Sequence, residues 1–126
     1  MSSYFTISLR PKRSEGDLSL VSYSRVSEVY DELYEGTTDS QGELTKEKID
    51  GIVGNLEAKI SRDKDQLHKY HELAKINTEY VEDYISFGEY VDNEIETLNK
   101  IKTIQDIVHD TYDGYNSFES VNWKIE

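Results

Sequence analysis

The 126-residue sequence contains no cysteine, and this absence closes several kinds of chemistry at once. Without thiolates the chain forms no disulfide, no cysteine-ligated zinc site, no iron–sulfur cluster and no covalent intermediate on cysteine. Glycine is also sparse, at seven residues, and the sequence contains neither a glycine-rich phosphate loop nor the glycine-flanked elbow of serine hydrolases. We therefore predict no catalytic residue and expect a protein that is not an enzyme.

Long apolar runs are missing as well. The mean hydropathy is −0.73, and no stretch approaches the run of about 18 apolar residues that a membrane-spanning helix requires. The N-terminus lacks the apolar core of a signal peptide, and its positive charges follow a short apolar stretch instead of preceding it. These features predict no membrane association and a cytoplasmic location.

Basic residues are few beside the acidic ones, at 14 against 26, which gives a net charge of −12. The excess is uneven, because residues 77–126 hold three basic and twelve acidic side chains and so carry −9. Such a segment repels the phosphates of nucleic acids and attracts basic surfaces. We therefore expect no direct nucleic-acid binding and a basic protein as partner.

The first 36 residues predict a small ββα unit. Apolar and polar residues alternate over 4–10, which indicates a half-buried strand that Pro11 ends. A turn follows, and residues 18–23 are a second strand of the same hairpin. From Ser24 the apolar spacing becomes helical, which predicts a short helix ending at Gly36.

Residues 37–44 have the composition of a loop, and Thr45 then offers an N-cap for a long helical segment over 45–113. Within it, two interleaved series of period seven start at Ile49 and Val53, and twelve of their sixteen positions are apolar or aromatic. This is the pattern of a coiled coil. The seam that it predicts consists of Ile49, Val53, Leu56, Ile60, Leu67, Tyr70, Val81, Tyr84, Val91, Ile95 and Leu98.

Two architectures fit this seam. A break near Asn77, with Thr78 as the cap of a second helix, would fold the acidic half back on the lysine-bearing half as a helical hairpin. Against it, the period continues through Asn77 without a slip, which favours one continuous rod. The exposed seam of a rod would have to be covered by a second copy of the chain, so a homodimer is the alternative to the hairpin.

Beyond Leu98 the apolar pattern shifts, and Thr103 with Asp106 resembles a capping box, which favours a new helix start there. Gly114 ends the helical part, and residues 114–126 predict a strand that joins the N-terminal hairpin. The expected fold class is therefore α+β, mainly α, within one folding domain.

The acidic segment 77–126 also contains tyrosines at positions where the helical pattern predicts exposure. Tyr80 and Tyr90 fall outside both series and lie among carboxylates, a combination suited to lysine and arginine side chains of a partner. The candidate binding face that this predicts consists of Glu79, Tyr80, Glu82, Asp83, Glu89, Tyr90, Asp92, Glu94 and Glu96.

Two patterns bear on metals. His68 and His71 lie at helical spacing beside Glu72, but a metal would need a third ligand from elsewhere, so we predict no metal site and no cofactor. The pairs Glu79/Glu82 and Glu89/Asp92 resemble the acidic motifs of all-α nucleotide pyrophosphohydrolases, which hold magnesium between helices. Only six residues separate these pairs, which puts both on one stretch of helix instead of on facing helices.

The leading functional hypothesis is a non-enzymatic acidic binding or inhibitor protein that docks on a basic, nucleic-acid-binding type of surface. The composition of this sequence is similar to that of immunity proteins and phage anti-defence proteins, which present carboxylates where the phosphates of a nucleic acid would lie. The alternative is a homo-oligomeric coiled-coil scaffold. A second alternative is an all-α metal-dependent hydrolase.

Overall fold

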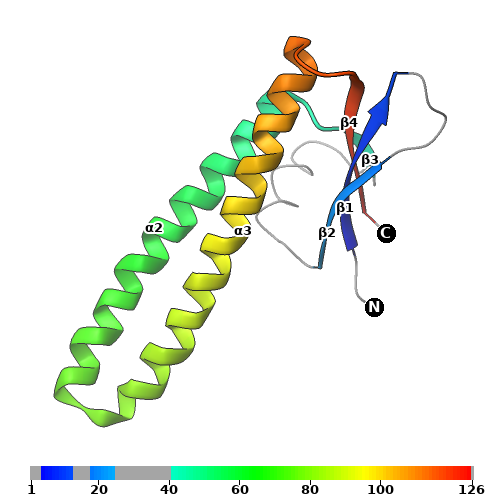
Figure 1. The fold of residues 1–126 in the computed structure, drawn as a ribbon. Coiled ribbons are helices and arrows are strands. Elements are labelled where there is room, and N and C mark those ends of the chain that lie inside the picture. The colour runs from blue at the N-terminus through cyan, green and yellow to red at the C-terminus, as the bar shows by residue number, and fades with distance from the viewer. Residues whose placement is uncertain (1–3, 13–17, 25–40, 126) are drawn as a thin grey trace. The chain divides into compact units, whose positions relative to one another are not determined.

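The computed structural model describes residues 4–12, 18–24 and 41–125, and it has the predicted α+β fold with mainly helical content (Figure 1). The short helix predicted before Gly36 lies outside the described residues. Contacts divide the chain into two compact units: residues 1–52 with 103–126, called unit 1 here, and residues 53–102, called unit 2. The elements are β1 (Tyr4–Pro11), β2 (Leu18–Ser24), β3 (Gln41–Glu43), α2 (Lys46–Ile76), the 3₁₀ turn η1 (Thr78–Tyr80), α3 (Val81–Asp113) and β4 (Phe118–Ile125).

Unit 1 contains a four-stranded antiparallel sheet in the order β2-β1-β4-β3. The predicted hairpin of β1 and β2 and the predicted return of the C-terminal strand are both confirmed, with Ile7 opposite Val21 on one side and Trp123 on the other. Alternation also holds, because Ile7 and Leu9 of β1 and Val121 and Trp123 of β4 are buried. They share the core of unit 1 with Leu44, which follows β3, and with apolar residues of both helices, namely Ile49, Ile52, Ile104 and Val108.

Residues 41–43, which the composition assigns to a loop, form the edge strand β3 instead. Gly42 lies opposite Trp123, and a Cβ at Gly42 would come within 3.0 Å of the indole Nε1. The glycine is therefore required by a close approach to an aromatic ring and not by a turn. The next residue, Leu44, is fully buried, and its amide donates to the Val121 carbonyl at 2.8 Å.

Both long helices have well-defined ends. The predicted cap at Thr45 is confirmed, since its hydroxyl accepts from the Lys48 amide at 3.3 Å. Helix α3 passes through Thr103 without interruption, so the predicted new start there is wrong. It ends at Gly114, as predicted, where φ is +83° and the Tyr115 amide reaches the Asp110 carbonyl at 2.8 Å. This bond, with that from Gly114 to Thr111, is the Schellman motif that glycine favours.

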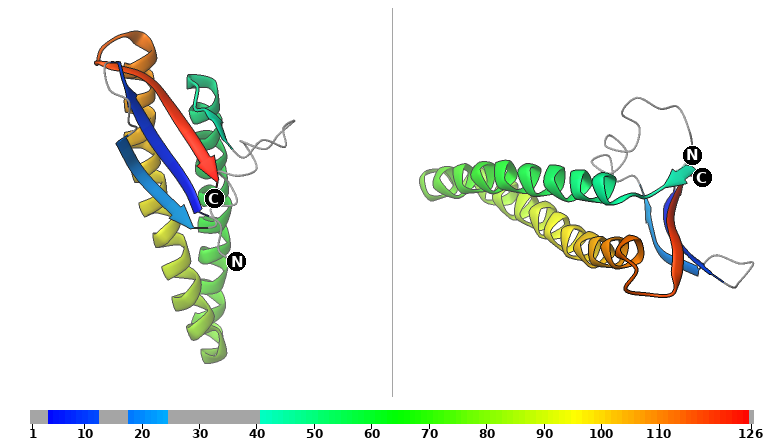
Figure 2. Two further views of the ribbon diagram at one scale, coloured as in Figure 1. Left: turned by 90° about the vertical axis from the view of Figure 1, so that its right-hand side faces the viewer. Right: turned by 90° about the horizontal axis from the view of Figure 1, so that it is seen from above.

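The chain folds back at Asn77, so the hairpin is the architecture of this chain and the continuous rod is wrong for it. Asn77 has extended backbone angles of φ −140° and ψ 120°, and its side-chain oxygen accepts from the Glu79 amide at 3.0 Å. Asn77, and not Thr78, therefore caps the segment that follows. The parts of α2 and α3 in unit 2 lie side by side and run in opposite directions (Figures 1 and 2).

The packing between these two helical segments changes along their length. Burial is greatest in the parts of unit 2 that are far in sequence from the turn at Asn77. The buried residues there are Val53, Leu56 and Ile60 of α2 and Val91, Leu98 and Ile101 of α3. From residue 61 to residue 90, no residue reaches that degree of burial. Aromatic pairs fill this stretch, with ring centroids 5.5 Å apart for Tyr70 and Phe87 and 5.0 Å apart for His71 and Tyr84.

Tyr112 joins the end of α3 to two strands of unit 1. Its hydroxyl donates to a Glu43 carboxylate oxygen at 2.6 Å and accepts from the Val121 amide at 3.2 Å. Burial and the adjacent Glu43 raise the pKa of the Tyr112 phenol to about 12. The neutral phenol is therefore the form that the folded state favours.

We expect Gly42→Ala to lower the free energy of unfolding by about 1–3 kcal/mol, because the added methyl group has no room beside the buried indole. The control is Gly54→Ala on the exposed face of α2, where a Cβ meets nothing within 4 Å. That change should raise stability by about 0.5–1 kcal/mol through helix propensity. Thermal unfolding followed by circular dichroism measures both, and a stable Gly42→Ala variant would contradict the assigned contact.

The raised pKa of Tyr112 also predicts loss of stability in alkali. The unfolded phenol has a pKa near its ordinary value of 10.0, so its contribution is complete below that pH and is lost as the pH rises toward 12. Tyr112→Phe should cost about 1 kcal/mol at neutral pH and should flatten this alkaline decline. Urea unfolding at a series of pH values measures the difference, and parallel curves for the two proteins would refute the assignment.

Candidate functional site

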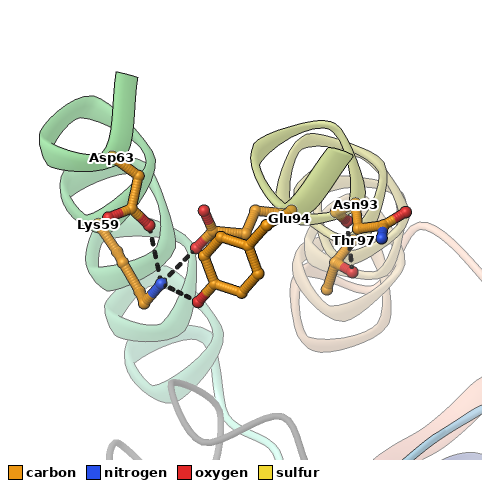
Figure 3. A network of polar contacts seen from close by, with 6 residues as sticks. Lys59, Asp63, Asn93, Glu94 and Thr97 are labelled. Carbon is orange, nitrogen blue, oxygen red and sulfur yellow. Dashed lines mark hydrogen bonds and ion pairs between the residues drawn. The ribbon is translucent and has the colours of Figure 1, made fainter. Parts of the chain in front are cut away.

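Lys59 of α2 forms the main polar contact between the two helices of unit 2. Its ammonium donates to Asp63 at 2.8 Å on its own helix and to Glu94 at 2.6 Å on α3 (Figure 3). It also donates to the Tyr90 hydroxyl at 2.6 Å and lies 4.7 Å from the centre of that ring. One cation thus binds two carboxylates and a phenol from two helices.

Partial burial controls the ionisation of this network. Burial alone would lower the pKa of Lys59, but its hydrogen bonds to Asp63, Glu94 and Tyr90 raise that pKa well above the ordinary range. Burial raises the pKa of the Glu94 carboxyl, against the lowering effect of Lys59. The Oε1 atom of Glu94 is buried without a hydrogen-bond partner among the described residues, which agrees with that direction.

Two residues of the predicted binding face are therefore engaged within the chain. The Glu94 side chain is only 10% exposed and pairs with Lys59. Tyr90 is 46% exposed, but its hydroxyl accepts a hydrogen bond from Lys59, and the centroids of its ring and the Phe87 ring are 5.7 Å apart. Another member, Tyr80, is half-buried in η1. Helical geometry, and not composition, decides which members of the acidic segment point outward.

Six acidic members of the predicted binding face are exposed, and all but one of them lack an internal cation. Glu96 pairs with Lys100 at 3.4 Å. The remaining five are exposed and form no ion pair within the described part of the chain. We call these five residues the acidic face: Glu79, Glu82, Asp83, Glu89 and Asp92.

Exposed apolar residues lie in the same part of the sequence, and the sequence analysis did not select most of them. Ile76 is 86% exposed and Ile85 is 54% exposed, while Leu73 and Val81 are each 39% exposed. Val81 belongs to the predicted seam, and the other three fall outside both series. Ile85 lies three residues after Glu82 and four before Glu89, which places all three on one side of α3. Its position off the seam was the signal that could have found it.

The other seam residues lie between the helices or in the core of unit 1. The buried ones are Ile49, Val53, Leu56, Ile60, Val91 and Leu98, and the half-buried ones are Leu67, Tyr70, Tyr84 and Ile95. Because the chain itself covers these side chains, a dimer through the same seam would require the two helices to separate. Self-association stays a prediction.

Unit 1 holds two further polar features that the sequence analysis did not select. His109 of α3 lies 2.7 Å from Asp50 of α2, and hydrogen bonds from His109 and Gln105 lower the pKa of the Asp50 carboxyl. A hollow of about 360 Å³ lies at β1, β3 and β4 and is lined in part by Arg10 and Lys124. Neither feature brings together a nucleophile, a base and an orienting group.

Comparisons with family models, with curated proteins and with solved structures found no match to this chain. Within the described residues, neither helix has a stretch that is both long and apolar enough to cross a membrane.

We expect Lys59→Met to lower the free energy of unfolding by about 1–3 kcal/mol at pH 7, because Asp63 and Glu94 lose their cation. The loss should shrink near pH 4. In the variant, burial without the lowering effect of Lys59 raises the pKa of the Glu94 carboxyl further, so near pH 4 this carboxyl is protonated and no longer needs a cation. Against the raising effect of burial, Lys59 also lowers the pKa of the Asp63 carboxyl in the parent protein, and the stability that this pair contributes is likewise lost as the pH falls.

Lys100→Met is the control for this variant, because Lys100 forms only an exposed pair with Glu96. It should change stability by less than about 0.5 kcal/mol at either pH. Urea unfolding of the parent chain and both variants at pH 7 and pH 4 measures the change in free energy of unfolding for each variant at each pH. Equal losses for the two variants would show that the Lys59 network contributes no more than a surface pair.

Proposed function

We propose that this chain is a non-enzymatic acidic binding protein, located in the cytoplasm, which docks the acidic face of η1 and α3 on a basic surface of a protein partner. The observation that carries the proposal is the set of five exposed carboxylates without an internal cation. Elsewhere in the helices, carboxylates such as Asp50, Asp63 and Glu94 do have cationic or hydrogen-bonding partners. Other exposed carboxylates of the helices, such as Asp65 and Asp106, also form no ion pair among the described residues, but the acidic face concentrates five of them within residues 79–92. This concentrated charge is left for an external partner.

Helix stability explains only part of this charge. Glu82 and Asp83 lie in the first turn of α3, where negative charge is favourable beside the helix N-terminus. Glu89 and Asp92 lie two to three turns further on, where the dipole of the helix end no longer acts. Their exposed charge has no structural use within the described residues, which supports a role in binding.

The exposed apolar residues supply the contact area for affinity that charge alone does not provide. Carboxylates attract a basic partner and speed its approach, but they contribute little affinity while they remain hydrated. Val81 and Ile85 add apolar area on the same helix, and apolar residues ringed by polar ones are typical of protein interfaces. A partner that combines lysine or arginine with an apolar centre fits this surface. Nucleic-acid-binding proteins present such basic surfaces, so inhibition of one is the specific form of the proposal.

Two features weigh against the alternatives. The scaffold hypothesis needs the seam for a second copy, although the hairpin already covers it. The hydrolase hypothesis needs acidic pairs on facing helices, whereas Glu82, Glu89 and Asp92 all belong to α3. We therefore propose neither function.

The test removes the charge of the acidic face without changing its shape. We expect a variant with Glu82→Gln, Asp83→Asn, Glu89→Gln and Asp92→Asn to bind its partner about 30-fold more weakly, since four exposed ion pairs together contribute about 2 kcal/mol. The tagged full-length chain captures the partner from an extract of its own cells, and the purified partner is then titrated. Affinity for the parent chain should fall steeply between about 50 and 500 mM salt.

A matched control loses the same number of charges elsewhere. Asp65, Asp106, Asp110 and Glu119 are exposed and form no ion pair among the described residues. Replacing them with their amides leaves the net charge equal to that of the first variant. This control should keep most of the affinity. Equal weakening in both variants, or an affinity that salt does not change, would contradict a specific acidic interface.

A further inference from the structure

A cluster of three metal-ligating side chains lies on α2 near the turn, away from the charged network of Lys59. His68, His71 and Glu72 each offer one ligand atom, and these atoms all lie within 4.8 Å of one another. The third ligand, which the sequence analysis expected from elsewhere, is supplied by the same helix one turn after His68. We propose that these three residues form a binding site for a late first-row transition-metal ion such as Zn²⁺ or Ni²⁺.

The ligand set fits such an ion chemically. Two imidazoles and one carboxylate are an established protein ligand set for zinc, and imidazole also suits nickel and copper. Metal–ligand bonds of about 2.0–2.2 Å in tetrahedral geometry place ligand atoms about 3.3 Å apart. The three atoms must therefore approach one another by at most about 1.5 Å. Rotation of these side chains on the helix surface supplies that movement without a change in the backbone.

Residues of both α2 and α3 surround the three ligands and favour metal binding. The His71 ring lies against Tyr84 of α3, with centroids 5.0 Å apart, which limits the orientations that the imidazole adopts. A hollow of about 250 Å³ lined by Leu67, His68, His71 and Tyr84 leaves space beside the cluster for a water or a fourth ligand. Three protein ligands and one open position give the four-coordinate arrangement that zinc prefers.

Two cations compete with the metal, and both are weak competitors. Lys75 pairs with Glu72 at 3.1 Å, but both side chains are about half exposed, so this pair costs little to break. Lys64 also lines the hollow, and its long side chain can move into solvent. Hard ions such as Mg²⁺ prefer oxygen ligands and should not compete for the two imidazoles.

Binding at this place would act on the part of the hairpin that has little apolar packing. Between residues 61 and 90 no side chain is fully buried, and ring contacts such as that of His71 with Tyr84 take the place of a core. A metal held by three residues of α2 stabilises the native helix over the unfolded chain by mass action. This inference does not depend on the proposed basic partner.

Isothermal titration of the full-length, chelator-treated chain with Zn²⁺, Ni²⁺ and Mg²⁺ tests the site. We expect one Zn²⁺ or Ni²⁺ per chain at micromolar affinity, a matching rise in melting temperature, and no response to Mg²⁺. The absorption spectrum with Co²⁺ should show nitrogen and oxygen ligands. Exchange of backbone amides in the last turns of α2 should slow when the metal is added.

Three variants separate this site from general attraction to an acidic protein. The double variant His68→Gln, His71→Gln should abolish Zn²⁺ and Ni²⁺ binding and the rise in melting temperature. Glu72→Gln should weaken the affinity for these ions at least about tenfold. His109→Gln removes the remaining histidine, which lies beside Asp50 in unit 1, and should leave the binding unchanged. Absence of Zn²⁺ and Ni²⁺ binding, binding that survives the double variant, or full affinity in Glu72→Gln would each overturn the proposal.

Discussion

The departure of Asn77 from helical geometry is the constraint on which unit 2 depends. Its extended backbone and its side-chain bond to the Glu79 amide stop α2 and start the segment that leads into α3. The apolar residues of one helix are then covered by the other helix of the same chain. A continuous helix would have left the same residues exposed to solvent or to a second copy. A single polar residue thus decides between self-contained packing and assembly.

The same fold-back decides which charges are neutralised. Lys59 meets Glu94 across the helices at 2.6 Å, and Lys102 approaches Glu57 at 3.9 Å. The lysine-bearing helix therefore satisfies only those carboxylates of α3 that face it. The acidic face points elsewhere and forms no ion pair within the described residues. The proposed binding surface follows from an excess of carboxylates over facing lysines, and from the helical period that separates inward from outward positions.

Packing in unit 2 is uneven, and the two proposed sites lie where it is weakest. The buried aliphatic residues occupy positions up to Ile60 and from Val91 onward, and the stretch between them relies on rings and polar groups. Exposed apolar residues such as Ile76 and Ile85 gather in this stretch. Surfaces that bind ligands or partners commonly come from the less stable parts of a fold. The buried parts supply the rigid support that positions them.

Periodicity in the sequence was sufficient for three strands and for the extent of the helical segment, but not for β3 or for the division of that segment at Asn77. Alternation predicted β1, β2 and β4, and the seven-residue repeat with Thr45 and Gly114 predicted the helical segment and both of its ends. Such patterns are local, because they reflect which side of a strand or helix is buried. Composition failed at Gly42, where glycine serves a contact with Trp123 that lies 81 residues away in sequence. Only the tertiary structure decided that Glu94 and Tyr90 contact Lys59. Glu89 and Asp92 form no ion pair within the described residues. The sequence shows how many carboxylates there are, but not which of them meet a cation.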